Sequence, residues 1–235
     1  MEIEGKTAFV TGGNRGLGHA YVRALLEAGA KKVYAAARDP SSVTLPRATP
    51  IKLDVTSPSS IAAAAAQCAD VDIVINNAGV LFANTPLLDP NTDEALTALF
   101  NTNVWGLLNV SRAFAPVLKA NGGGALVNML SLLSWLSRPR TSSYSLSKAA
   151  AWAVTNGLRN ELRDQGTLVM GVHAGLIDTD MGRSLGGPST SPDDIAKCVI
   201  EGILRGDQEV LADDASRRVK SGLSLGDAPY LADQR

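Results

Sequence analysis

The sequence predicts an α/β protein with one doubly wound parallel sheet of about seven strands and helices on both faces. Short apolar runs rich in β-branched residues alternate along the chain with longer segments of helical periodicity, as in successive βαβ units. Several of the short runs, such as VDIVI and ALVNML, are largely apolar throughout. Such runs are typical of strands that helices cover on both faces.

The expected strands lie at residues 7–11, 32–36, 49–53, 73–76, 124–129, 169–173 and 209–212. The expected helices lie at 18–28, 58–67, 93–120, 142–164 and 192–205, with a last one at 215–221. Ser57 or Pro58 can open the helix at 58–67, and Ser191 before Pro192 can cap the helix at 192–205. The sequence has no internal repeat and no Pro/Gly-rich linker, so we expect a single domain over residues 1–235.

Composition and charge exclude several classes of protein. The 235 residues are 45% hydrophobic and 19% charged, with 22 Lys and Arg against 23 Asp and Glu. This balance is typical of a globular chain and leaves no basic excess to attract nucleic acid or anionic lipid. Two cysteines fit a reducing compartment, and the acidic N-terminal segment does not resemble a signal peptide. No apolar run reaches the roughly 18 residues that a membrane span needs. Taken with the charge balance and the cysteine count, this leads us to expect a cytoplasmic protein without nucleic-acid or membrane partners.

A glycine-rich loop, Thr11-Gly12-Gly13-Asn14-Arg15-Gly16-Leu17-Gly18, joins the first expected strand to the first expected helix. Such a loop lets backbone N–H groups approach a diphosphate, and the helix N-terminus adds a favourable dipole. Glycine is needed where a Cβ would block that approach. The position of the loop therefore favours a dinucleotide site over an ordinary glycine-rich turn.

The end of the second strand distinguishes the two nicotinamide cofactors. A carboxylate there pairs with the ribose 2′-hydroxyl of NAD, and an arginine accommodates the 2′-phosphate of NADP. Ala37 stands at this position, Arg38 follows it, and Arg15 is a second cation in the glycine loop. We therefore predict a preference for NADP(H) over NAD(H). The alternatives are that both arginines are solvated, or that Arg38 pairs with Asp39.

Tyr144 and Lys148 stand four residues apart and so share one face of an expected helix. A free tyrosine has a pKa of about 10, and an ammonium held close to it favours the phenolate and lowers that pKa. The pair can therefore act as a tunable proton donor and acceptor. Ser131 lies 13 residues upstream at the end of the fifth expected strand, and Ser134 is a competitor at shorter spacing.

These motifs, with Asn76-Asn77-Ala78-Gly79 and Asn103, resemble the short-chain dehydrogenase/reductase family over about residues 5–181. The resemblance implies a Rossmann-like fold and hydride transfer between C4 of a nicotinamide and a carbonyl carbon. It implies that Ser131 hydrogen-bonds the substrate carbonyl, that Tyr144 protonates it, and that Lys148 also holds the nicotinamide ribose. Asn103 would support a water path to the lysine, with Asn101 as a nearby alternative. The implied catalytic set is Asn103, Ser131, Tyr144 and Lys148.

The resemblance also implies which residues hold the cofactor. Asp54 would contact the adenine amino group, with helix capping as the alternative, and residues 76–79 would stabilise the sheet near the adenosine ribose. Thr179 would bond the nicotinamide carboxamide or a phosphate. The implied set is Gly12, Asn14, Arg15, Gly16, Leu17, Gly18, Arg38, Asp54, Val55, Asn77, Ala78, Gly79, Tyr144, Lys148, Gly175, Ile177 and Thr179.

The chain departs from the family pattern after the sixth strand, where Ala174-Gly175 replaces the usual Pro-Gly. Proline fixes φ, so its loss should loosen this turn without removing a catalytic group. We interpret the neighbouring His173 as structural rather than as a base. Two histidines and two distant cysteines show no metal-ligand spacing, so we expect no metal.

Three segments are expected to set substrate selectivity: residues 80–89, 132–140 and 176–191. Their apolar side chains favour an apolar carbonyl compound, and the glycine-rich part at 182–191 is a candidate lid. The expected substrate contacts are Leu133, Trp135, Leu176 and Met181. Helices 93–120 and 142–164 carry enough apolar surface to predict a homodimer or homotetramer through them.

Together these features predict an NADPH-dependent carbonyl reductase, or a reversible alcohol dehydrogenase, with a small-molecule carbonyl or alcohol substrate. An NAD-linked dehydrogenase is one alternative. An epimerase or dehydratase on the same scaffold is another, and Ser131, Tyr144 and Lys148 argue against it. A non-catalytic NADPH sensor is the third, which the complete catalytic set disfavours.

Overall fold

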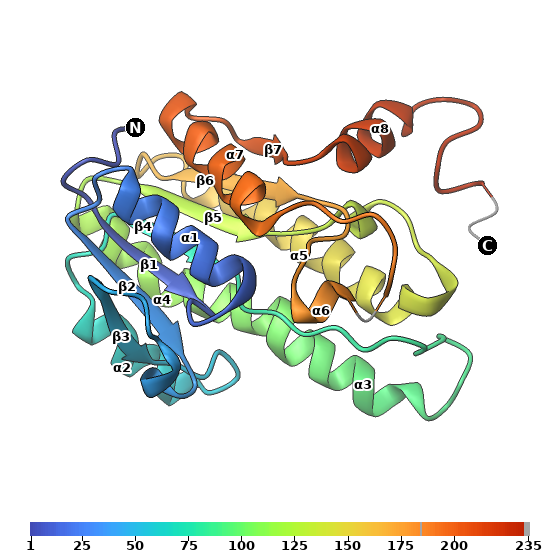
Figure 1. Cartoon of the computed structure of the whole chain (residues 1–235), viewed down its shortest axis with the longest axis horizontal. Helices are drawn as coiled ribbons and strands as arrows, with labels where there is room; N and C mark the ends of the chain where they lie inside the picture. Colours follow the sequence, from blue (N-terminus) through green and yellow to red (C-terminus); the bar gives the residue numbers. More distant parts are fainter. Residues whose placement is uncertain (184, 233–235) are drawn as a thin grey trace.

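Over the described residues 1–183 and 185–232, the computed structural model has a parallel sheet of seven strands in the order β3-β2-β1-β4-β5-β6-β7 (Figure 1). The strands are β1 (Thr7–Thr11), β2 (Lys32–Ala37), β3 (Ala48–Lys52), β4 (Ile73–Asn76), β5 (Ala125–Met129), β6 (Leu168–His173) and β7 (Glu209–Leu211). All pairings between these strands are parallel. The predicted α/β class and doubly wound sheet are confirmed.

Helices cover both faces of the sheet (Figure 1). One face carries α1 (Gly16–Glu27) and α7 (Pro192–Arg205), and the other carries α2 (Pro58–Gln67), α4 (Leu107–Ala120) and α5 (Ser142–Glu161). The remaining helices are α3 (Thr92–Leu99), α6 (Asp180–Arg183) and α8 (Asp214–Gly222). Within residues 1–183 and 185–232, no helix combines the length and hydropathy needed to cross a bilayer.

The central strand β1 shows how one sequence fills two cores. Successive strand side chains point to opposite faces. Ala8 and Val10 are buried with the side chains of α1 and α7, and Phe9 is buried with those of α2, α4 and α5. The Phe9 ring lies 4.5 Å from that of Phe114 on α4. Because both faces of β1 are buried, Ala8, Phe9 and Val10 are all apolar, with no alternation between apolar and polar residues.

Two expected helix starts are confirmed by their caps. The Ser57 hydroxyl accepts a hydrogen bond from Ser60 N at 3.3 Å, and the Ser191 hydroxyl accepts one from Asp193 N at 3.1 Å. Pro58 and Pro192 then occupy the first helical position, where a missing N–H costs nothing.

The expected single helix at 93–120 is instead three pieces. Between α3 and α4 the chain forms a π-helical turn over Phe100–Gly106. Such turns disturb the regular hydrogen-bond ladder and are frequent at functional sites. Apolar periodicity runs through all three pieces, so the sequence pattern does not reveal the break.

Buried amides hold β4 beside β5. Asn76 Nδ2 donates to Asn128 Oδ1 at 2.9 Å and to the Ser111 hydroxyl at 3.0 Å. Asn128 Nδ2 donates in turn to the Thr155 hydroxyl at 3.0 Å. Buried polar groups are costly unless they are paired, so this chain of bonds fixes the two strands against α4 and α5.

Candidate active site

A cleft of about 600 Å³ opens at the carboxyl ends of the central strands. Open α/β sheets bind ligands at this edge. Every residue that the sequence analysis assigned to the cofactor lines this cleft. So do several that it did not assign: Ser42, Thr56, Val80, Met129 and Leu130.

The glycine loop is shaped by contacts with the segment after β4. Asn77 Nδ2 donates to Thr11 O at 2.9 Å and to Gly12 O at 3.3 Å, and Asn77 N donates to the Thr11 hydroxyl. Gly12 has a φ of +66°, and a Cβ on Gly18 would collide with the Gly12 carbonyl. Only glycine fits at these two positions, and the backbone is left open to a diphosphate.

The two predicted phosphate-binding arginines differ in their surroundings. Arg38 is exposed at the cleft and makes no ion pair with any described residue. Asp39 does not pair with it, because its carboxylate accepts hydrogen bonds from Ser41 Oγ at 2.7 Å and Ser41 N at 3.0 Å, which lower the pKa of Asp39. Arg15 lies 3.6 Å from Asp180 at the start of α6. The Arg38 guanidinium therefore remains free to bind an anion.

Asp54 both caps a turn and faces the cleft. Its Oδ1 accepts hydrogen bonds from the Thr56 hydroxyl at 2.7 Å and from Thr56 N at 2.9 Å, and these lower the pKa of Asp54.

A hydrogen bond joins the glycine loop to the turn after β2: Asn14 Nδ2 donates to the Ser42 hydroxyl at 3.0 Å. A serine in such a turn carries no sequence signal of its own, which is why Ser42 was missed.

Ser131 lies where β5 turns into a short 3₁₀ helix, Leu132–Ser134. Its hydroxyl accepts a hydrogen bond from Leu133 N at 3.1 Å and lies 3.4 Å from Ala174 O, to which it donates. The competing Ser134 does not line the cleft, and its buried hydroxyl has no partner among the described residues. The geometry therefore favours Ser131 as the serine that can meet a substrate.

Tyr144 and Lys148 line the same cleft from the first turns of α5. Lys148 is 5% exposed, and its Nζ donates to Met129 O at 2.8 Å while lying 5.7 Å from the Tyr144 ring centroid. Burial lowers the pKa of Lys148 to about 8 and raises the pKa of Tyr144. The expectation that the ammonium lowers the tyrosine pKa is thus wrong for this geometry, because the lysine bonds Met129 and burial dominates.

Asn103 is buried in the π-helical turn and joins three elements. Its Oδ1 accepts from Val80 N at 2.9 Å, and its Nδ2 donates to Val80 O and to the Ser147 hydroxyl, both at 3.0 Å. The Ser147 hydroxyl then donates to the Tyr144 carbonyl at 2.7 Å. Asn101 is exposed on the outer surface. Asn103 therefore braces the helix that carries the tyrosine, through a serine that the sequence analysis overlooked.

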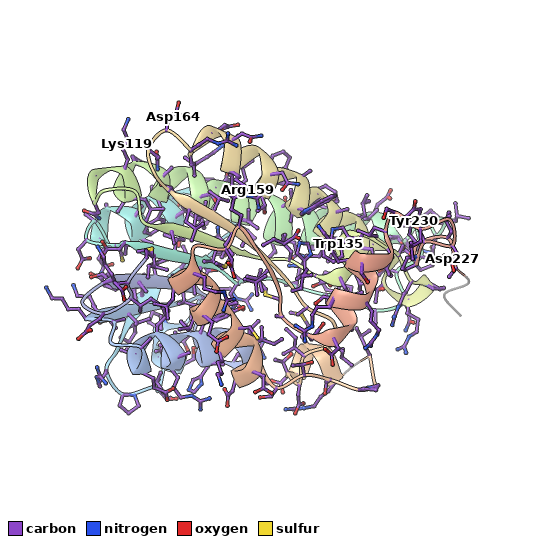
Figure 2. All side chains as sticks on the ribbon, turned by 90° about the horizontal axis from the view of Figure 1, so that it is seen from above. Lys119, Trp135, Arg159, Asp164, Asp227 and Tyr230 are labelled. Carbon is purple, nitrogen blue, oxygen red and sulfur yellow. The ribbon has the colours of Figure 1, made fainter. Side chains whose placement is uncertain are left out.

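The expected substrate residues are not brought together. Met181 lines the cleft, but Leu133, Trp135 and Leu176 do not. The Trp135 ring stacks on His173 at 3.9 Å between centroids and lies beside α8 (Figure 2). An indole gains more from stacking on a buried aromatic ring than from exposure, which accounts for this placement.

Backbone hydrogen bonds join the two ends of the segment that was predicted to form a lid. Asp178 N donates to Thr190 O at 2.9 Å, and Thr190 N donates to Leu176 O at 2.8 Å. Ser184, within this segment, lies outside the described residues. In the part of the chain that the structure describes, no cluster of His, Cys, Asp and Glu could hold a metal ion.

Replacing Lys148 by methionine should stabilise the protein at neutral pH. A fall in pKa from 10.5 to about 8 corresponds to about 3 kcal/mol of destabilisation while the group is charged. Loss of the bond to Met129 O offsets about 1 kcal/mol of the gain. Chemical denaturation of Lys148→Met should therefore show a free energy of unfolding about 2 kcal/mol above wild type at pH 7.

The sign of the pH dependence follows from the direction of the shift. The unfolded lysine holds its proton up to a higher pH than the folded one, so wild-type stability rises as pH increases from about 8 to about 10.5. The advantage of Lys148→Met should shrink over that window. Lys119→Met, at the surface in Figure 2, should show no such trend. A variant less stable than wild type at pH 7 would contradict the prediction.

Comparisons with known proteins agree with this geometry. A family model for short chain dehydrogenases matches residues 6–188. A crystal structure of a short chain dehydrogenase from Burkholderia cenocepacia J2315 in complex with NADP superposes with a TM-score of 0.91 at 38% identity, covering 96% of this chain and 95% of that one.

Among sequences, the short chain dehydrogenase tazN of Aspergillus terreus is 34% identical over 82% of this chain and 45% of that protein. The short chain dehydrogenase pigC of Monascus ruber is 34% identical over 80% of this chain and 66% of that protein. The chain thus spans less than two thirds of the length of these two relatives. The NADP-dependent 3-hydroxy acid dehydrogenase of Schizosaccharomyces pombe is 29% identical over 90% of this chain and 92% of that protein. The chain belongs to the short-chain dehydrogenase/reductase family.

Proposed function

We propose that this protein is an oxidoreductase, namely an NADPH-dependent carbonyl reductase that also runs in reverse as an alcohol dehydrogenase. The observation that carries the proposal is the shared cleft: Ser131, Tyr144 and Lys148 line the same space as the glycine loop. A cofactor seated on that loop would therefore share one cavity with the proton-donating side chains.

The bound cofactor supplies the hydride, and the protein orients the reactants and supplies the proton. The Ser131 hydroxyl proton lies in a long contact of 3.4 Å with Ala174 O, so rotation of the hydroxyl can direct it to a substrate oxygen while Oγ still accepts from Leu133 N. Tyr144 gives up the proton that converts the developing alkoxide to an alcohol. Burial keeps the pKa of Tyr144 raised in the free protein, but Lys148, largely protonated at pH 7, places a positive charge 5.7 Å from the ring centroid that stabilises the phenolate left after proton transfer.

Three observations support NADPH over NADH. No acid stands at Ala37, Arg38 lies at the cleft without an ion-pair partner among the described residues, and Arg15 lines the same cleft. The Burkholderia structure is a complex with NADP, and the fission-yeast relative is NADP-dependent. A 2′-phosphate would give both guanidinium groups an anion to bind.

For the substrate we propose an apolar ketone or aldehyde. The apolar side chains of Val80, Leu130 and Met181 line the cleft together with Ser131 and Tyr144. Such a surface favours an apolar carbonyl compound, with the hydroxyl groups fixing its oxygen. Both cysteines are free thiols, and we propose a reducing, cytoplasmic location on that basis.

Tyr144→Phe should lower turnover of a ketone or aldehyde by at least about 100-fold, because only the proton donor is lost. NADPH binding, followed by cofactor fluorescence, should stay within about twofold of wild type. Tyr230→Phe, which alters an exposed phenol outside the cleft, should match wild type in both measurements. Turnover by Tyr144→Phe near the wild-type rate would show that another group delivers the proton.

Arg38→Ala should raise the dissociation constant of NADPH about tenfold or more, because a charge-assisted bond to the 2′-phosphate is lost. The dissociation constant of NADH should change less than about twofold, since NADH lacks that phosphate. Arg112→Ala, outside the cleft, should change neither constant. Equal losses for both cofactors would mean that Arg38 does not contact the phosphate.

We also propose that a second copy of the chain covers the outer face of α3, the π-helical turn and α5. A shallow groove on this face is lined by Leu96, Phe100, Trp105 and Leu146. Trp105 is 49% exposed and Leu146 is 44% exposed, which is costly for side chains of this size. Burial of this face in a homodimer or homotetramer would remove that cost.

Light scattering coupled to size-exclusion chromatography tests the assembly. Wild type should have at least twice the mass of one chain, and Trp105→Glu should shift it towards one chain because a carboxylate would be buried in the interface. Leu204→Glu changes a similarly exposed apolar residue, 46% exposed, on α7 and should leave the mass unchanged. A wild-type protein with the mass of one chain would contradict the proposal.

A further inference from the structure

A fully buried histidine contacts the turn that carries the catalytic serine. His173 ends β6, and its Nδ1 lies 2.9 Å from Ser131 O. A carbonyl oxygen can only accept, so at this distance Nδ1 carries the hydrogen and donates it. Ser134 N donates to the same carbonyl at 3.0 Å. Both lone pairs of the Ser131 carbonyl are therefore used, one by its own 3₁₀ turn and one by the histidine.

The same imidazole also supports the far end of the turn. The Trp135 ring stacks on it with centroids 3.9 Å apart and planes 19° apart. The Trp152 ring meets Trp135 edge-on at 6.4 Å. His173 thus contacts the first and the last residue of segment 131–135, by a hydrogen bond at one end and by stacking at the other.

The charges around the ring favour a neutral imidazole with a fixed tautomer. Nε2 has no hydrogen-bond partner among the described residues and lies 3.7 Å from Glu209 Oε1 on β7. Lys220 on α8 pairs with the Glu209 carboxylate at 2.9 Å, and Lys148 approaches from α5. Burial lowers the pKa of His173 to about 4 against the attraction of Glu209. The ring therefore stays neutral near pH 7, with its hydrogen on Nδ1.

We propose that His173 is a positioning residue that holds Ser131 in the orientation needed to donate to the substrate oxygen. The role rests on the proposed carbonyl reduction. The residue after His173 is Ala174, where a proline would have fixed φ, so contacts from neighbouring side chains must hold this turn. The Ser131 hydroxyl itself makes only a long contact, 3.4 Å, with the Ala174 carbonyl. The imidazole fixes the serine from the backbone side, and Asp213 Oδ2 fixes the following turn by accepting from Gly175 N at 2.6 Å.

Two variants separate the hydrogen bond from the stacking. His173→Leu and His173→Asn both lose the aromatic ring, but the asparagine Nδ2 can replace the histidine Nδ1 as donor. With a ketone that wild type reduces, His173→Leu should lower kcat at least about tenfold with KM and the NADPH dissociation constant within about threefold. His173→Asn should restore kcat to within about threefold of wild type. Equal losses of kcat in the two variants, or none in His173→Leu, would overturn the proposal.

Hydrogen exchange supplies a readout that does not need a substrate. The Leu133 and Ser134 amides donate to Ser131, so they should exchange at least about tenfold faster in His173→Leu and at the wild-type rate in His173→Asn. A wild-type protein that reduces no ketone would contradict the proposed function, but the exchange rates of the two variants could still be compared. Unchanged exchange in His173→Leu would overturn the positioning role.

The wild-type protein gives an independent answer if the variants do not fold. Nitrogen-15 NMR of the histidine side chains should show His173 as the neutral Nδ1–H tautomer from pH 8 down to pH 5. The half-buried His19 is the second histidine of the chain and gives the reference signal in the same spectra. An Nε2–H tautomer, or a charged His173 at pH 7, would overturn the proposal.

Discussion

A buried ammonium constrains the active site more than any other group. Lys148 is almost completely enclosed, and Met129 O, at the end of β5, accepts a hydrogen bond from it. Burial disfavours its charge, yet the proposed chemistry needs that charge close to a tyrosine whose own pKa is raised by burial. The surrounding fold must therefore stabilise a lysine that would be more stable in water. Its position on α5 and its hydrogen bond to the end of β5 keep it in place.

Sheet topology explains how distant parts of the sequence form one cleft. Strands β1, β4, β5 and β6 are neighbours and run in the same direction, so the segments that follow them meet at one edge. Those segments carry the glycine loop, Asn77, Ser131 and Thr179. Cross-links between them are short and specific, as in the bonds from Asn77 to Thr11 and from His173 to Ser131. These hydrogen bonds fix the glycine loop and the Ser131 turn relative to their neighbouring strands.

Much of the fold could be predicted because its signals are local. Buried parallel strands read as apolar runs, and Ser57 and Ser191 are caps that the sequence marks directly. The residues assigned to the cofactor all line one cleft, as expected for motifs that follow neighbouring strands. The π-helical turn around Asn103 could not be predicted, because the apolar pattern is the same on both sides of it.

Three of the four expected substrate residues do not line the cleft, for a physical reason. Trp135 is apolar and lies close to Ser131 in the chain, but the direction of its ring depends on His173, which is 38 residues away and belongs to another strand. Ser147 was overlooked because a serine inside a helix carries no sign of the asparagine that it bonds. The positions of these side chains depend on contacts between different elements, and the periodicity of the sequence does not reveal such contacts.

Transfer of a label from cofactor to product tests whether this site delivers hydride to a carbonyl. The protein would be incubated with an apolar ketone and NADPH that carries deuterium at both C4 positions, and the alcohol would be analysed by mass spectrometry. We expect one deuterium at the carbinol carbon of each alcohol molecule formed. Binding of NADPH without formation of a labelled alcohol, from a broad set of ketones and aldehydes, would contradict it.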